Sequence, residues 1–201
     1  LTEQYENIER EFHKLSTLPN LKKLSFNFPV FTNNNAKAFS KFRELEELYL
    51  RNLKIDSLQQ LIDAFPENNQ LKVLDLSISN ESFIENYSSL KNLEILEIRS
   101  RFNFPLDNSL YDLPNLKKLK INTKKLEYLD ERLGNLQDLE ELNLQYNTLK
   151  KLPKSIGKLS KLKVLNLRNN QITHLPEEIE NLSRLETLQV SDNQLSSLPD
   201  G

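Results

Sequence analysis

The sequence predicts an α/β solenoid, a curved right-handed horseshoe whose short strands stack into a parallel sheet on the concave side. Leucines recur in register at steps of 22 to 26 residues from Leu21 to Leu185, and self-similarity at such a period is typical of repeat architectures. Within each copy, apolar and polar residues alternate with the period of two that a strand requires. Further apolar residues close the core on the return side, for example Ile156 and Leu159.

Three apolar positions define the repeat, and no copy breaks them. A leucine opens each copy, a second leucine follows three residues later, and an apolar residue follows two residues after that. This alternation points Leu165 and Leu167 inward and Asn166 and Arg168 outward. Each copy buries its apolar side only against its neighbours, so stability depends on stacking. The copies start near Leu21, Leu45, Leu71, Leu93, Leu116, Leu139, Leu162 and Leu185, and the last one is incomplete.

The most regular copy runs from Leu162 to Arg184 and reads LKVLNLRNNQITHLPEEIENLSR. It resembles the leucine-rich repeat in its roughly 23-residue form, with Leu-Pro opening the convex half, as in bacterial and Ras-linked repeat proteins. The resemblance covers residues 15–201. It implies a non-catalytic scaffold that binds a protein partner with its concave sheet.

The ninth position of the repeat divides the chain into two halves. The last three copies carry Asn147, Asn170 and Asn193 there, and we expect their side-chain amides to bond backbone groups in a stacked ladder. The first five copies carry other residues, so their turns are expected to be less regular. These residues are Pro29, Leu53, Ser79, Arg101 and Lys124.

The longest copy is expected to carry a true helix on its convex side. Within residues 56–65, the apolar Leu58, Leu61, Ile62 and Phe65 fall at helical spacing. The other copies lack such a pattern, and their return segments are expected to be shorter.

Residues 1–14 are expected to form a helix that caps the repeat domain of residues 15–201. Tyr5, Ile8, Phe12 and Leu15 follow one another at helical spacing, and a cap of this kind covers the apolar end of a solenoid. The alternative is a helix that binds a membrane surface or a partner. At the other end, residues 198–201 stop in the middle of a copy, so we expect the sequence to be a piece of a longer protein.

Composition argues against several classes of partner. With 27 basic and 29 acidic residues, the net charge of -2 gives no field that would attract nucleic acid or an anionic membrane. No stretch of 18 apolar residues is present, so no membrane span is expected. The chain has no cysteine, which fits an intracellular or a bacterially exported protein.

Catalysis, metal binding and cofactor binding are not expected. His13 and His174 are the only histidines, and neither has a partner by spacing. Three glycines are too few for a phosphate-binding loop. The paired carboxylates, such as Glu140 and Glu141, occupy exposed repeat positions and are interpreted as solvated.

The outward strand positions are the candidate partner-binding surface that the resemblance implies. Tyr49, Val73, Ile78 and Ile95 are expected to add apolar area beside arginines, which is the composition of interface hot spots. The alternative is that the β-branched residues only support the sheet. The predicted binding residues are Tyr49, Arg51, Val73, Asp75, Ile95, Glu97, Arg99, Lys120, Asn143, Asn166 and Arg168.

Two other functions compete with a simple scaffold. The repeats could be the recognition arm of a larger signalling enzyme or bacterial effector whose catalytic domain lies outside this sequence. Glycan or nucleic-acid binding is a third hypothesis, and for nucleic acid it predicts an affinity that falls steeply with salt.

Overall fold

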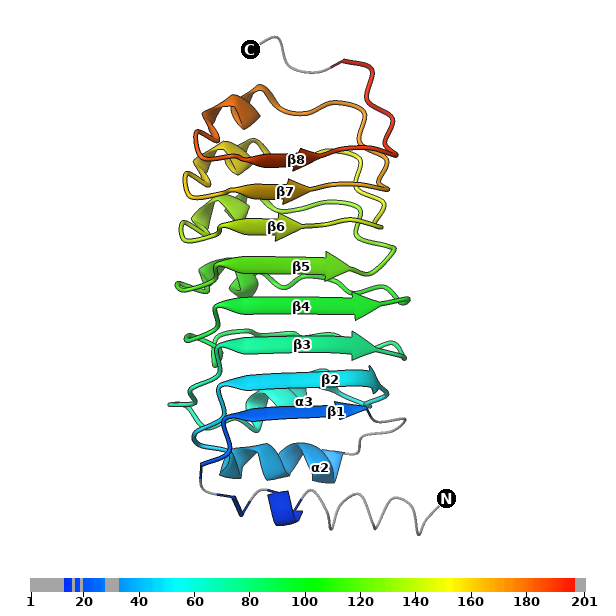
Figure 1. Ribbon diagram of the computed structural model, residues 1–201. Helices are drawn as coiled ribbons and strands as arrows, with labels where there is room; N and C mark the ends of the chain where they lie inside the picture. Colours follow the sequence, from blue (N-terminus) through cyan, green and yellow to red (C-terminus); the bar gives the residue numbers. More distant parts are fainter. Residues whose placement is uncertain (1–12, 16, 19, 28–32, 198–201) are drawn as a thin grey trace.

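The computed structural model describes residues 13–15, 17–18, 20–27 and 33–197. One parallel sheet of eight strands, stacked in sequence order, runs the length of the molecule (Figure 1). The predicted solenoid with a parallel sheet is confirmed. The strands are β1 (Lys23–Asn27), β2 (Glu47–Leu53), β3 (Val73–Ile78), β4 (Ile95–Ser100), β5 (Lys118–Asn122), β6 (Glu141–Asn143), β7 (Val164–Asn166) and β8 (Thr187–Gln189).

Strand register follows the repeat that the sequence predicts. Leu74 of β3 pairs with Leu96 of β4, which pairs with Leu119 of β5. The same repeat position continues through Leu142 to Leu165. Equivalent residues therefore lie side by side along these strands, whereas between β2 and β3 the register shifts after Leu50, so that Leu53 pairs with Ile78.

Short helical segments lie behind most of the strands, on the side of the sheet that we call the convex side, and α2 lies at the end of the stack next to β1 (Figure 1). Helix α3 confirms the predicted helix in the longest copy, although it is shorter than residues 56–65. It begins after Ser57, whose hydroxyl accepts a hydrogen bond from the Gln60 amide at 3.4 Å. The convex segments are α2 (Asn33–Lys37), η1 (Ala38–Lys41), α3 (Leu58–Asp63), η2 (Asn108–Asp112), η3 (Glu131–Asn135), η4 (Lys154–Lys158) and η5 (Glu177–Asn181).

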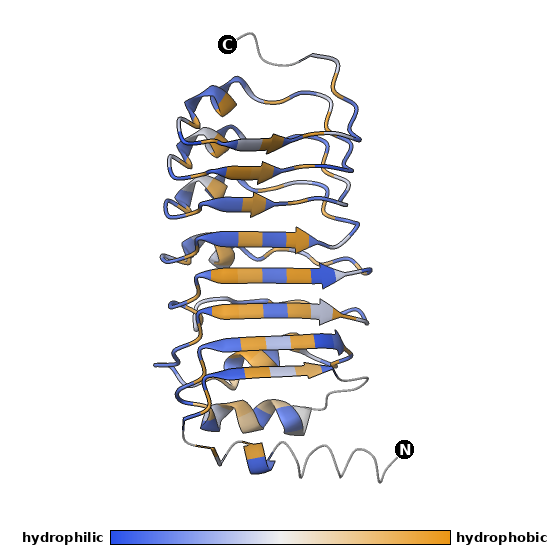
Figure 2. Ribbon diagram, in the orientation of Figure 1, coloured by the Kyte–Doolittle hydropathy of each residue, from blue (hydrophilic) through white to orange (hydrophobic). Residues whose placement is uncertain are grey.

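The core lies between the sheet and these segments. Hydrophobic and hydrophilic residues alternate along much of the central strands (Figure 2), as expected for strands with one face in the core. Leu93, Leu116, Leu139 and Leu162, which open four successive copies, are all at most 1% exposed. In the first coils, Phe39 packs against Phe65 with ring centroids 5.2 Å apart.

The asparagine ladder forms as predicted in the last three copies. Asn147 donates hydrogen bonds to the carbonyls of Ile121 and Leu144 at 2.7 and 2.9 Å, and accepts one from the Thr123 amide at 3.1 Å. Asn170 and Asn193 repeat the two donor bonds one and two coils later, and their oxygens accept from the Leu149 and Ile172 amides. Each amide therefore ties its own turn to the preceding coil.

A partial substitute for this ladder occurs in the first half of the chain. Asn80, one position later in its copy, donates to the Ile55 carbonyl at 2.9 Å and accepts from the Ile55 amide at 3.1 Å. A link between neighbouring turns is thus also present where the ninth-position asparagine is missing.

Two predictions lie mostly outside the described residues. At the end of the proposed capping segment and the first residue of the repeat domain, residues 13–15 are helical, while residues 1–12 are not described. The incomplete copy at residues 198–201 and Pro29 are likewise outside. Among the helices of the described ranges, none is long and apolar enough to cross a membrane.

Candidate functional site

The predicted binding residues lie in adjacent rows on the open face of the sheet, because they alternate with the buried leucines. Strand pairing sets Tyr49 beside Asp75, Asp75 beside Glu97 and Glu97 beside Lys120. The row continues through Asn143 and Asn166. Arg51 and Arg99 stand one row further along β2 and β4, and Arg168 lies just beyond β7.

Ile78 was expected on this face, and that expectation is wrong. It is 4% exposed and pairs with the buried Leu53. The reason is the period of the strand, since Ile78 follows Leu76 by two residues and points to the same side. Val73 and Ile95 do lie on the open face, where they are neighbours in register and partly exposed.

Four charged side chains form a central charge network, which consists of Arg51, Asp75, Glu97 and Arg99. Arg51 donates two hydrogen bonds to the Asp75 carboxylate, at 3.0 and 2.6 Å. From the other side, Arg99 donates to Asp75 at 2.5 Å and to Glu97 at 2.8 Å. Lys120 extends the network to Glu97 at 3.7 Å. The two predicted hot-spot arginines are therefore already oriented by one carboxylate.

Asp75 is the most buried member, with only 6% of its side chain exposed. Burial raises the pKa of its carboxyl, and the Arg51 guanidinium acts in the opposite direction. Desolvation of the carboxylate therefore offsets much of the favourable ion pairing. The network contributes more to the orientation of the arginines than to stability.

Tyr49 is held against the sheet beside the network. Its hydroxyl donates to Glu47 at 2.9 Å, and the Lys23 ammonium lies 4.8 Å from the ring centroid. Lys23 also pairs with Glu47 at 2.7 Å. The ring is thus pre-positioned and still partly exposed for contact.

The two predicted asparagines have local partners. Asn143 and Asn166 each accept a hydrogen bond from the backbone amide two residues later, at 3.2 and 3.1 Å. Asn166 is also buried. Both asparagines are the last residues of their strands, and these hydrogen bonds stabilise the turns that follow. They therefore have a structural role on the open face of the sheet.

A row of alternating charges follows the strand-entry edge, and sequence reasoning missed it. It occupies the position after each opening leucine, and that periodic Lys and Glu pattern was the available signal. Glu46 bridges Lys22 at 2.6 Å and Lys72 at 2.7 Å. The hydrogen bonds from these lysines lower the pKa of Glu46 to about 2. The row is Lys22, Glu46, Lys72, Glu94, Lys117, Glu140, Lys163 and Glu186.

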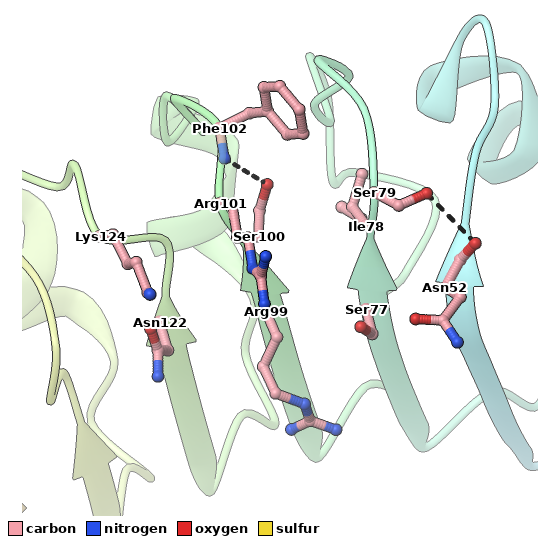
Figure 3. Close-up of a pocket in the computed structure, with 10 residues that line it drawn as sticks. All are labelled: Asn52, Ser77, Ile78, Ser79, Arg99, Ser100, Arg101, Phe102, Asn122 and Lys124. Carbon is pink, nitrogen blue, oxygen red and sulfur yellow. Dashed lines mark hydrogen bonds between the residues drawn. The ribbon is translucent and has the colours of Figure 1, made fainter.

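A hollow of about 630 Å³ opens at the carboxyl ends of β2 to β5 (Figure 3). It borders the central charge network through Arg99 and extends past Phe102 and Asn122 to Arg101 and Lys124. None of its lining residues is acidic. In the sequence, Arg101 and Lys124 differ from the asparagine found at the ninth position of the last three copies, but this difference does not predict a hollow. We call this feature the rim hollow.

The histidines lie apart from these surfaces. His174 is within hydrogen-bond distance of Thr173 and Ser196, and His13 is within hydrogen-bond distance of Lys41. In the described ranges, no group of three or more His, Cys, Asp or Glu side chains is placed to hold a metal ion.

Comparison with known proteins identifies the repeat. Residues 137–195 match the family model described as leucine rich repeat. The chain is similar to a leucine-rich-repeat protein of Leptospira interrogans, with 26% identity and a TM-score of 0.59, over 92% of this chain and 58% of that one. None of the curated proteins matches the sequence significantly.

Two further solved structures show the same architecture. The leucine-rich-repeat domain of the type III effector XopL is 25% identical with a TM-score of 0.65, over 94% of this chain and 75% of that one. The Arabidopsis receptor kinase HAESA, in complex with a peptide hormone and a co-receptor, is 26% identical with a TM-score of 0.69. That match covers 92% of this chain and 32% of HAESA.

Proposed function

We propose that this chain is a non-catalytic scaffold that binds a protein partner on the concave sheet, because residues 137–195 match the leucine rich repeat model and the fold resembles that of leucine-rich-repeat proteins. The observation that carries the proposal is the pair Arg51 and Arg99, held by Asp75 from both sides. Binding normally costs free energy because side chains must be ordered at the interface. Side chains that are ordered beforehand reduce this cost.

The neighbouring residues supply the rest of an interface. Tyr49 presents a fixed aromatic ring, and Val73 and Ile95 add apolar area between the charged rows. Tyrosine and arginine around an apolar centre are enriched at binding hot spots. The HAESA structure, with its bound peptide hormone and co-receptor, supports a protein or peptide as the kind of ligand.

A pull-down with the intact chain, followed by affinity measurement with the purified partner, tests the proposal. The double substitution Tyr49→Ala with Arg99→Ala should weaken binding by about 2 kcal/mol or more. The matched control is Tyr128→Ala with Arg132→Ala, which removes the same residue types from exposed positions away from the concave sheet. Unchanged affinity in a folded Tyr49 and Arg99 variant would reject the concave site.

A second candidate is the recognition arm of a larger effector or signalling enzyme. The similarity to the repeat domain of the effector XopL favours it. Reading the gene beyond the codon for Gly201 tests this candidate. A catalytic domain in the same reading frame would support it, and further repeats followed by a stop codon would reject it.

A further inference from the structure

We propose that the rim hollow binds an acidic segment of the partner, with a carboxylate placed between Arg101 and Lys124. This inference rests on the proposed function, since it assumes a protein ligand. It deepens that function by proposing that the segment of the partner that lies over the carboxyl ends of β4 and β5 is negatively charged.

Charge is the first argument. Along the strand-entry edge, Lys22, Lys72, Lys117 and Lys163 each pair with a glutamate within 2.8 Å. Across the described ranges, by contrast, the side chains of Arg101 and Lys124 take part in no ion pair or hydrogen bond. Both are exposed on one hollow that no acidic residue lines. A ligand carboxylate would supply the missing counter-charge.

The backbone supplies an independent argument. Lys124 has a φ of 60°, in the left-handed region, as do Asn52, Asn169, Asp192 and also Tyr146 in other turns. Asparagine and aspartate tolerate this region because their short side chains bond locally, whereas lysine gains no such bond. The turn alone would be better served by asparagine. A residue that conflicts with its local backbone often serves a function.

The shape of the hollow fits a short peptide segment. Its volume of about 630 Å³ lies within the range of roughly 300–1,000 Å³ found for ligand pockets. Phe102 is 38% exposed, and its ring leans over the hollow towards β3 (Figure 3). An apolar side chain next to the ligand carboxylate would contact this ring.

The orientation of Arg99 separates the rim hollow from the central charge network. Its guanidinium is turned towards Asp75 and Glu97. Its positive charge is therefore neutralised within the chain, and the free cations of the hollow are Arg101 and Lys124. These two residues are the ones to substitute.

Two-dimensional NMR of the nitrogen-15-labelled chain tests the proposal with a defined probe. The probe is the capped peptide acetyl-Ser-Asp-Leu-Glu-Ser-amide, and its neutral counterpart carries Asn and Gln in place of Asp and Glu. We expect the acidic probe to shift the amide signals of residues 99–102 and 122–124 saturably. The neutral probe should leave them unchanged.

Lys124→Asn is the sharpest variant, because the left-handed turn favours asparagine. It should weaken probe binding at least fivefold while the Tm stays the same or rises. Arg101→Ala should weaken binding similarly. The matched controls Lys91→Asn and Arg132→Ala, at exposed positions away from the hollow, should bind the acidic probe like the native chain.

Three outcomes would overturn the rim assignment. The first is equal shifts from both probes, and the second is unchanged binding of the acidic probe by Lys124→Asn and Arg101→Ala. The third is saturable binding of inorganic phosphate at residues 99–102 and 122–124 without a response of these residues to the acidic peptide. Failure of the proposed function is recognised separately. If the partner binds Tyr49→Ala normally but binds Lys124→Asn more weakly, the proposed site around Tyr49 and the central charge network is contradicted. If it binds Lys124→Asn normally but Tyr49→Ala more weakly, only the rim hollow is contradicted.

Discussion

Arg51 of β2 reaches diagonally to Asp75 of β3, and its guanidinium donates two hydrogen bonds to the Asp75 carboxylate, at 3.0 and 2.6 Å. Arg99 reaches the same carboxylate from β4. One acidic side chain thus fixes two arginines on neighbouring strands. The centre of the concave face is ordered before any partner arrives.

Asp75→Asn should separate orientation from stability. Burial raises the pKa of the Asp75 carboxyl, and both arginine side chains remain partly exposed, so neither is left as a buried unpaired charge. We therefore expect the free energy of unfolding to change by less than about 1 kcal/mol. Partner affinity should nevertheless fall at least fivefold, because Arg51 and Arg99 lose their common anchor. Urea unfolding and titration measure the two effects, and a stability loss above about 3 kcal/mol would show that the network is mainly structural.

Acid stability should depend on Glu46. Its pKa is about 2 in the folded chain, against 4.5 for the free side chain. A folded pKa below the unfolded one gives stability that is present above pH 4.5 and is lost as the pH falls towards 2. Glu46→Gln should therefore lower the Tm at pH 6 and reduce the drop in Tm between pH 5 and pH 3. A drop as large as in the native chain would contradict this role.

The asparagine ladder should weaken towards the last coil. Asn147→Ala leaves the carbonyls of Ile121 and Leu144 and the Thr123 amide without this partner in a buried turn. The expected loss is about 3 kcal/mol, because unsatisfied buried groups retain their desolvation cost. Asn193→Ala should cost about 1 kcal/mol, since Asn193 is only partly buried. Equal losses in chemical denaturation would argue against this gradient.

Close packing of the convex segments should make Gly157 irreplaceable. A Cβ atom at this position would overlap the Glu178 carbonyl oxygen in the next coil. Gly157→Ala should destabilise the chain by about 2 kcal/mol, which is the usual range for overpacking. At Gly134, a Cβ would lie 2.8 Å from the Ser155 side chain, so a smaller loss is expected there. A Tm of Gly157→Ala equal to the native value would show that η4 and η5 can separate without cost.

Much of the fold follows from periodicity alone. The spacing of Leu93, Leu116, Leu139 and Leu162 predicts both the sheet and its register, because each copy can bury its leucines only against the next. The helix at Leu58–Asp63 and the bonds of Asn147 were also predictable from local patterns. The inward position of Ile78 follows from the same period and was misassigned.

The candidate sites were less predictable, since they depend on side-chain geometry. The sequence indicates that Arg51 and Arg99 face outward, but it does not show that both would end on Asp75. The rim hollow combines residues from four strands that are about one repeat apart. In the sequence, Arg101 and Lys124 are only irregular residues at the ninth position of two copies, and the stacking of the coils places both at the same hollow.

Hydrogen exchange of the chain with and without its captured partner tests the central claim most directly. We predict slower amide exchange at β2 to β5 and at residues 99–102 and 122–124 in the complex. Exchange in the convex segments η3 to η5 should stay unchanged. Protection confined to those convex segments, with the concave strands unaffected, would contradict the account.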